Sequence, residues 1–206
     1  MGDRHVIYCL MGKSASGKDT IYRALKDRAE KSREILLQEV VPYTTRPMRE
    51  GERDGEAYYF RSDAEFERAG REGRIIESRD YSVVSGIWHY YTEDDGQIDL
   101  TRQNYLLIGT LESYGSFCRY YGKENVVPLY VELEAGKRLQ RALDREKREP
   151  HPRYAELCRR FLADEADFSE EKLKAAGICE RFTNEHLEDC VEEIWKKICQ
   201  ESDLTG

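Results

Sequence analysis

The sequence predicts an α/β fold in which helices flank a parallel sheet. Three apolar segments, at 6–11, 105–108 and 126–133, are typical of buried parallel strands. Charged segments with helical spacing separate them, so strands and helices alternate along the chain. The first apolar segment also leads directly into a glycine-rich loop and then a helix. The chain has 206 residues, which fits a single domain.

The glycine-rich loop at 12–20 reads GKSASGKDT and contains the complete GxxxxGK pattern of a phosphate-binding loop. Gly12 and Gly17 let backbone N–H groups turn toward a phosphate, and Lys18 supplies a mobile positive charge. Asp19 occupies the position at which Ser or Thr usually contacts Mg²⁺, and Thr20 follows it. Neither is assigned as a direct metal ligand, because either would act through Mg²⁺ bound to the nucleotide. The alternative is a chance glycine turn after a strand.

Composition excludes several other classes of function. The net charge of −8 does not steer the chain as a whole to nucleic acid, so phosphate chemistry must rest on local basic groups. The six cysteines form no CxxC pair and the four histidines are scattered, so no metal site is predicted. The N-terminal apolar run is too short for a signal peptide, and no stretch is long enough to span a membrane. We therefore expect a cytoplasmic protein with free thiols and no membrane partner.

A second informative stretch, 42–60, reads PYTTRPMREGERDGEAYYF. It carries Arg46, Arg49 and Arg53 in a loop marked by proline and glycine, followed by a short aromatic strand. Arginines three residues apart in a loop can converge on one anion with planar, bidentate geometry. The alternative is a solvated charged loop, which is the usual fate of such a composition.

This stretch resembles the nucleotide-monophosphate-binding segment of guanylate kinases, TTRPxRxGExDGxxYxF. The resemblance covers most of the chain and is strongest at 12–20 and 42–60. It implies that Arg46, Arg49 and Tyr58 hold the phosphate of GMP. The matching residues are Thr44, Thr45, Arg46, Pro47, Arg49, Gly51, Glu52, Asp54, Gly55, Tyr58 and Phe60.

Glu77 follows two isoleucines and resembles the glutamate that reads guanine in this family. Guanine presents two adjacent donors on its pairing edge, and one ionised carboxylate can accept from both. The following segment, 78–92, is expected to be a loop that returns to Tyr91, a further predicted GMP contact. Thr92 stands where the family has glycine, the spacing before it is longer than usual, and Pro42 replaces a guanine-contacting serine. These departures affect the predicted contacts with the base and not those with the phosphate. The sequence therefore predicts a nucleoside monophosphate as substrate more firmly than it predicts guanine as its base.

The segment 137–160 resembles the mobile lid of nucleoside monophosphate kinases. Its basic residues follow a helical pattern that breaks at Pro150 and Pro152, and the alternative is a solvated helical hairpin. The resemblance implies that Arg141, Arg145 and Arg160 close over the transferring group. Asp167 stands for a glutamate of the family's second lid helix, Asn184 lies where the family has an asparagine near adenine, and Glu112 is the candidate for an acidic role at the end of the strand at 105–108.

The resemblance implies a P-loop NTPase fold: a three-layer parallel sheet flanked by helices, with a small mixed β insertion and a helical lid. We predict one domain, with a core at 1–34, 93–136 and 161–206, a monophosphate-binding subdomain at 35–92, and the lid at 137–160. Further predicted helices cover 20–33, 62–72, 113–121, 164–176 and 185–201, further strands cover 35–37 with 40–41, 58–60, 73–77 and 178–182, and 93–103 is a helix or turn.

The function implied by the resemblance is ATP-dependent phosphorylation of GMP to GDP, with Mg²⁺ bound to ATP. The catalytic residues would be Lys18, Arg141, Arg145 and Arg160. The ATP-binding residues would be Gly12, Ser14, Ala15, Ser16, Gly17, Lys18, Asp19, Thr20 and Asn184, and the GMP-binding residues Arg46, Arg49, Tyr58, Glu77 and Tyr91. Two alternatives remain: another small-molecule kinase on the same scaffold, such as a kinase of ribose bisphosphate, or an inactive guanylate-kinase-like binding module. Monomer and homodimer both remain open.

Overall fold

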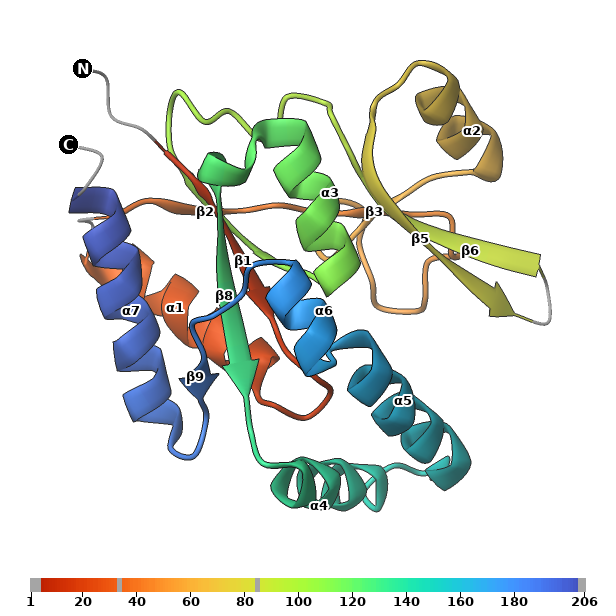
Figure 1. The fold of residues 1–206 in the computed structure, drawn as a ribbon. Coiled ribbons are helices and arrows are strands. Elements are labelled where there is room, and N and C mark those ends of the chain that lie inside the picture. The colour runs from red at the N-terminus through yellow and green to blue at the C-terminus, as the bar shows by residue number, and fades with distance from the viewer. Residues whose placement is uncertain (1–4, 33–34, 84–85, 204–206) are drawn as a thin grey trace.

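A computed structural model describes residues 5–32, 35–83 and 86–203. Its centre is a five-stranded sheet in the order β2-β7-β1-β8-β9, and every neighbouring pair is parallel (Figure 1). The predicted parallel sheet is therefore confirmed. Its strands are β1 (Ile7–Met11), β2 (Leu37–Glu39), β7 (Asn104–Ile108), β8 (Val126–Glu132) and β9 (Phe182–Thr183).

Helices cover both faces of this sheet, which gives the predicted three layers. Successive side chains of a strand point to opposite faces, so Tyr8 and Leu10 pack into one core while Cys9 and Met11 pack into the other. The first core is closed by α1 (Lys18–Ser32) and α7 (Leu187–Asp203), and the second by α3 (Leu111–Tyr121) and α6 (Glu170–Ala175). The helix expected over 20–33 is α1, although residue 33 lies outside the described residues.

A second, four-stranded mixed sheet lies beside the first, in the order β4-β3-β6-β5. It is the predicted β insertion, and helix α2 packs against it (Figure 1). Its elements are β3 (Tyr43–Thr44), β4 (Tyr59–Phe60), α2 (Asp63–Arg71), β5 (Ile75–Val83) and β6 (Gly86–Glu93).

The loop expected over 78–92 is wrong, because this segment forms most of a long β-hairpin made by β5 and β6. Cross-strand contacts stabilise the hairpin: the Tyr81 and Tyr90 rings meet edge to face at 5.2 Å, and His89 Nδ1 lies 2.7 Å from Asp80 Oδ1. Residues 84–85, between the two strands, lie outside the described part of the chain.

The predicted start of the subdomain at 35 is also corrected. The strand expected at 35–37 lies at Leu37–Glu39 and pairs with β7 in the large sheet, and residues 40–41 are not in a strand. The mixed sheet therefore begins at β3. After β6, residues 94–103 contain turns and no helix. A turn was one of the two forms predicted for 93–103, and a helix was the other.

The segment predicted as the lid covers most of two helices, α4 (Ala135–Glu146) and α5 (Tyr154–Asp167), with Pro150 and Pro152 in the turn between them. The second helix runs past the predicted boundary at 160. The helix expected over 164–176 is two segments, because α5 ends at Asp167 and Ser169 caps α6. A short 3₁₀ turn, η1 (Lys123–Asn125), precedes β8. Among the described helices, none is long and apolar enough to cross a membrane.

Helix α2 begins with a capping box, as expected from Ser62 and Glu65. The Glu65 backbone N–H donates to Ser62 Oγ at 3.3 Å, and Glu65 Oε2 accepts from the Ser62 N–H at 2.9 Å. We expect Ser62→Ala to lower the free energy of unfolding by about 1 kcal/mol, the usual loss for an N-cap. Chemical denaturation checks this, and the control is Ser82→Ala, a change at an exposed residue of β5. Equal stabilities of the two variants would contradict a capping role.

Candidate active site

The glycine-rich loop at 12–20 follows β1 and packs tightly against β8 and the segment around Asn184. A Cβ atom at Gly12 would lie 2.5 Å from the backbone oxygen of Val131, so glycine is required there. Gly17 has a φ of +95° and Ala15 a φ of 62°, conformations that favour glycine. The Ser16 N–H donates to Lys13 O at 3.1 Å, which closes the turn. These contacts restrict the conformations open to the loop.

Asn184 holds this loop from the far end of the chain. Its Nδ2 donates to Ser16 O at 2.7 Å, its side chain is buried, and its own backbone N–H donates to Glu132 O at 2.9 Å. Arg141 approaches the same residue, with NH2 donating to Asn184 O at 3.4 Å. Asn184 thus supports the loop in addition to its predicted place near a nucleotide base.

A cavity of about 380 Å³ opens over the loop, and we call it the loop cavity. It brings residues predicted to bind ATP, in the loop and at Asn184, together with Arg141 and Arg145, which were predicted as catalytic. Its lining residues are Ala15, Gly17, Lys18, Asp19, Thr20, Arg141, Arg145, Asn184 and Leu187. Gly12 and Ser16 lie buried beneath it.

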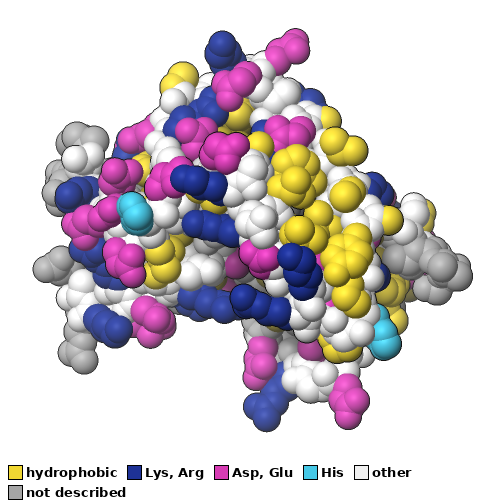
Figure 2. Space-filling model, turned by 90° about the horizontal axis from the view of Figure 1, so that it is seen from below, with side chains coloured by type: hydrophobic (Ala, Val, Ile, Leu, Met, Phe, Trp, Pro, Cys, Tyr) yellow, Lys and Arg dark blue, Asp and Glu magenta, His cyan; other side chains and the backbone are white. Residues whose placement is uncertain are grey.

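Basic groups surround this part of the molecule. Figure 2, which views the protein from the side of α4 and α5, shows Lys and Arg side chains gathered across the middle of the face. Anions bound there would be attracted by these charges and by the N-terminus of α1, which begins at Lys18.

A second cavity, of about 300 Å³, lies between the large sheet and the mixed sheet, and we call it the base cavity. Glu77 lines it and is only 5% exposed. The Thr92 hydroxyl donates to Glu77 Oε1 at 3.0 Å, while Glu77 Oε2 has no hydrogen-bond partner. Burial raises the pKa of the Glu77 carboxyl, and the nearby Arg79 partly opposes this rise. Glu77 Oε2 accepts no hydrogen bond and lies 3.4 Å from Arg79 Nε, so this oxygen can still accept from a donor in the cavity.

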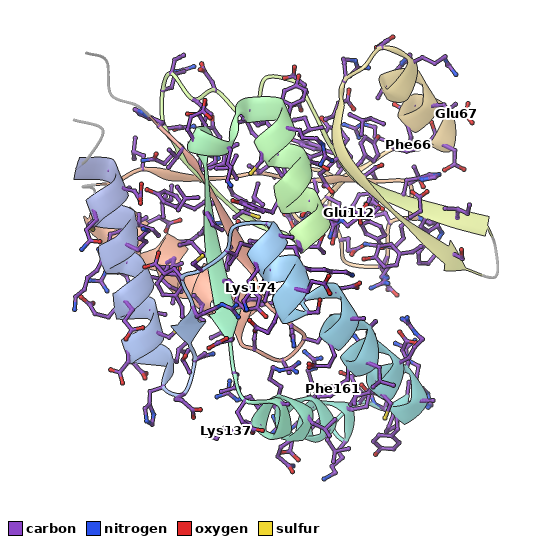
Figure 3. The ribbon with its side chains drawn as sticks, in the orientation of Figure 1. Phe66, Glu67, Glu112, Lys137, Phe161 and Lys174 are labelled. Atoms are coloured by element: carbon purple, nitrogen blue, oxygen red, sulfur yellow. The ribbon has the colours of Figure 1, made fainter. Side chains whose placement is uncertain are left out.

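Pro42, Leu107, Ile108 and Phe117 supply apolar walls to the base cavity. Ile108 occupies the end of β7 and is 37% exposed. Glu112, predicted to take an acidic role here, is exposed at the start of α3 and does not line the base cavity (Figure 3).

The predicted phosphate clamp is built around Arg46, which is 4% exposed. Its NH2 and NH1 donate to Glu52 Oε1 and Oε2 at 2.8 and 3.0 Å, a bidentate pair. The guanidinium also lies over the Tyr58 ring at 5.7 Å from its centroid. The Arg49 backbone N–H donates to Glu52 Oε2 at 2.7 Å, so one carboxylate holds the Arg46 guanidinium and the Arg49 backbone. These hydrogen bonds hold the pKa of Glu52 below its usual range.

Tyr91 does not reach the base cavity, which corrects the prediction that it contacts GMP. Its side chain is fully buried on the other face of β6, stacked on Tyr43 at 5.2 Å. Tyr90 is on the face that carries Thr92, and its ring meets the Tyr58 ring edge to face at 5.5 Å. Alternate residues of a strand share a face, so Tyr90, and not Tyr91, lies on the Thr92 side of β6 beside Tyr58.

A third cavity, of about 1070 Å³, lies between α5, the hairpin and the start of α3, and we call it the outer cavity. Arg160 and Asp167 of α5 line it, together with Ser14 of the loop. Arg160 therefore lines the outer cavity, whereas Arg141 and Arg145 line the loop cavity. Asp19 lines both the loop cavity and the base cavity, and Arg79 lines both the base cavity and the outer cavity. The three cavities therefore adjoin one another around the loop.

Two carboxylates of α5 that sequence reasoning missed bind the loop directly. Asp164 Oδ2 accepts from the Ser14 N–H at 2.6 Å. Glu165 pairs with Lys13 at 2.6 Å and also with Arg138. The sequence placed the acidic role at Asp167, which instead pairs with Lys172 at 3.6 Å. The charge pattern of α5 alone does not distinguish these three acids.

The described residues contain no cluster of three His, Cys, Asp or Glu side chains suited to hold a metal ion by themselves. Asp19 nevertheless offers a hard oxygen at the junction of the loop and base cavities, and Thr20 offers a hydroxyl in the loop cavity. Oxygen donors of this kind suit Mg²⁺ that keeps several waters and is bound largely by nucleotide phosphates.

Comparison with known proteins finds one family at the N-terminal part of the chain. The family model described as guanylate kinase matches residues 4–93. A guanylate kinase of Enterococcus faecalis is 40% identical over 81 residues, which cover 39% of this chain and 38% of that protein. One of Thermobifida fusca is 41% identical over 73 residues, 35% of each chain. The chain thus matches about two fifths, or slightly less, of the length of these curated relatives.

A structural comparison extends over nearly the whole chain. The crystal structure of guanylate kinase from Anaplasma phagocytophilum matches with a TM-score of 0.64, covering 98% of this chain and 88% of that one. The two sequences are 20% identical, so this similarity shows the fold. The predicted α/β fold, a parallel sheet flanked by helices with a separate mixed sheet, is therefore confirmed beyond the segment that the sequence comparisons match.

Proposed function

We propose that this chain, whose residues 4–93 match the guanylate kinase family model, transfers the γ-phosphoryl group of ATP to GMP. The observation that carries the proposal is the junction of the loop and base cavities at Asp19. One cavity is lined by a phosphate-binding loop with Lys18, and the other by a buried carboxylate with an unpartnered oxygen, Glu77. Two nucleotides seated there would meet at their phosphates.

The loop cavity is the proposed ATP site. The N–H groups of the loop and the side chain of Lys18 would hold the phosphates, and Mg²⁺ would neutralise their charge as part of Mg-ATP. Asp19 and Thr20 are the residues of this chain placed to meet the hydrated ion. Arg141 and Arg145 line the same cavity and would stabilise charge on the transferring group.

The base cavity and the clamp are the proposed GMP site. Arg46, Arg49, Tyr58 and Tyr90 would hold the acceptor phosphate, and Glu77 would accept from guanine. A phosphate oxygen of GMP is already an anionic nucleophile, so the chain needs no general base. Alignment and charge neutralisation are the main contributions that phosphoryl transfer requires from a protein.

The helical pair α4–α5 is the proposed lid. Its closure would carry Arg160 across the outer cavity toward the phosphates and exclude water that would otherwise hydrolyse ATP. The expected cytoplasmic location and the absence of a nucleic-acid partner belong to the same proposal.

The test is a coupled assay of ADP release from Mg-ATP with GMP, dGMP, AMP, CMP, UMP and dTMP as acceptors. Strong preference for GMP supports the proposal. Turnover with ribose bisphosphate in place of a nucleoside monophosphate would favour the other kinase on this scaffold. Nucleotide binding without turnover would favour an inactive binding module.

The pH dependence of GMP binding should reflect Glu77. Burial raises its pKa above the usual glutamate range, and the protonated carboxyl cannot accept from both donors of guanine. The KM for GMP should therefore rise as the pH falls through this raised pKa. The stability of the folded protein depends on pH with the opposite sign. Burial favours the protonated carboxyl of Glu77, so the stability that this group contributes is lost as the pH rises through the same pKa.

Steady-state kinetics across the acid range measure this effect. Because the phosphate of GMP also titrates, the control is Glu77→Gln, which sees the same substrate ionisation but lacks the carboxyl. An identical acid limb in both proteins would contradict the assignment to Glu77.

A further inference from the structure

The base cavity contains a cation beside its buried carboxylate. Arg79 lies two residues after Glu77 on β5, so both side chains are on the same face. Arg79 Nε is 3.4 Å from Glu77 Oε2, too far for a short, charge-assisted hydrogen bond. Both atoms are buried, and neither has a hydrogen-bond partner. A donor and an acceptor are thus held side by side, each with unused hydrogen-bonding capacity.

Three hydroxyl donors of the base cavity are already engaged, and the fourth, on Tyr58, belongs to the proposed phosphate clamp. The hydroxyl of Thr92 donates to Glu77 Oε1 at 3.0 Å, that of Ser113 to Thr110 O at 3.0 Å, and that of Tyr22 to Leu106 O at 3.4 Å. Pro42 has no N–H to offer. Within the described part of the chain, Arg79 is the cationic residue that lines this cavity.

Guanine presents along one continuous edge two donors, at N2 and N1, followed by two acceptors, at O6 and N7. A carboxylate matches the donors, and a guanidinium is the most common partner of the acceptors, which it binds in bidentate fashion. Glu77 and Arg79 present these two groups in adjacent positions. In adenine an amino donor replaces O6, and N1 is an unprotonated acceptor. The guanidinium of Arg79 would therefore face a donor, and the carboxylate of Glu77 would face an acceptor.

We propose that Arg79 is a second base-reading residue, which donates to O6 and N7 of guanine while Glu77 accepts from N1 and N2. This inference rests on the proposed function and assigns the specificity of the same site to a pair of residues. Arg79 supplies the donor that Pro42 cannot. The base would also satisfy the two buried atoms, Nε and Oε2, that lack partners in the structure.

Arg79 also lines the outer cavity, from which it could contact the transferring phosphate instead. The two roles affect different kinetic constants. A base contact formed in both the bound substrate and the transition state acts on KM, whereas a contact formed only in the transition state acts on kcat.

The experiment compares GMP with 7-deaza-GMP, which lacks only the N7 acceptor, and with IMP, which lacks only the N2 donor. The proteins are the wild type, Arg79→Met, Arg79→Lys and Glu77→Gln, with Arg71→Met on exposed α2 as a matched control. Thermal unfolding and circular dichroism are measured for each variant. Arg79→Lys keeps the charge but not the bidentate geometry.

We expect Arg79→Met to raise the KM for GMP by about 10- to 100-fold, the range for one bidentate base contact, with kcat nearly unchanged. The wild type should bind 7-deaza-GMP more weakly than GMP, and Arg79→Met should abolish this difference. The preference for GMP over IMP should survive in Arg79→Met and disappear in Glu77→Gln. Arg79→Lys should recover little, and Arg71→Met should resemble the wild type.

A fall in kcat with unchanged KM, or equal discrimination against 7-deaza-GMP in the wild type and Arg79→Met, would overturn the proposal. If Arg79→Met does not fold, the wild type decides alone, because equal KM values for GMP and 7-deaza-GMP exclude the N7 contact. Failure of the proposed function is a separate result, since the wild type would then not phosphorylate GMP at all.

Discussion

Lys18→Ala should lower kcat/KM for phosphoryl transfer by about 10³-fold or more while leaving the fold intact. Removing one preorganised group that stabilises developing charge typically lowers a rate by about 10²- to 10³-fold, and Lys18 carries a full charge. Its side chain lines the loop cavity and is not part of either hydrophobic core. The loss should therefore appear in catalysis and not in stability.

The measurement is the coupled ADP-release assay, with thermal unfolding of both proteins in parallel. Lys31→Ala, an exposed residue in the last turn of the same helix α1, controls for loss of a positive charge. Turnover near the wild-type value in Lys18→Ala would reject the assignment of the loop cavity to ATP. A drop of equal size in Lys31→Ala would indicate a general electrostatic effect.

Glu77→Gln should produce the second large effect, confined to GMP. An amide keeps one acceptor and gains an NH₂ donor, which would face a donor of guanine. Two charge-assisted hydrogen bonds are each worth roughly 1.5–3 kcal/mol, so kcat/KM for GMP should fall by about 10²- to 10⁴-fold. Turnover of AMP, which lacks the donor pair, should change little.

The ratio of kcat/KM values for GMP and AMP measures this selectivity. Glu67→Gln is the matched control, because Glu67 lies on exposed α2, away from the base cavity (Figure 3). Equal losses for GMP and AMP would show that Glu77 does not read the base. Since the variant leaves Arg79 without its neighbouring carboxylate, thermal unfolding separates instability from lost recognition.

Local motifs explain which parts of the site could be predicted. The loop at 12–20 and the clamp formed by Arg46 and Arg49 each lie within a few consecutive residues, so their spacing encodes their geometry. The alternation of apolar and charged segments likewise predicted the parallel sheet and its flanking helices, because burial on both faces requires nearly continuous apolar strands.

The errors arose where structure depends on register or on distant contacts. The hairpin was not predicted, and a shift of one residue in a strand exchanges its two faces, so the sequence did not show that Tyr91 lies on the buried face and Tyr90 on the face of Thr92. Asp164 binds the loop across 150 positions of sequence, and Asn184 does so across 168. Nothing in the local pattern around either residue indicates such a partner.

The strand order has a consequence for synthesis of the chain. β1 pairs only with β7 and β8 among the described strands, and both are made after residue 93, where the family match ends. Gly12 packs against Val131, and the loop accepts its hydrogen bond from Asn184. During synthesis the loop at 12–20 would therefore lack these contacts until Asn184 has left the ribosome. The segment with the most recognisable sequence thus depends for its own packing on strands that are made much later.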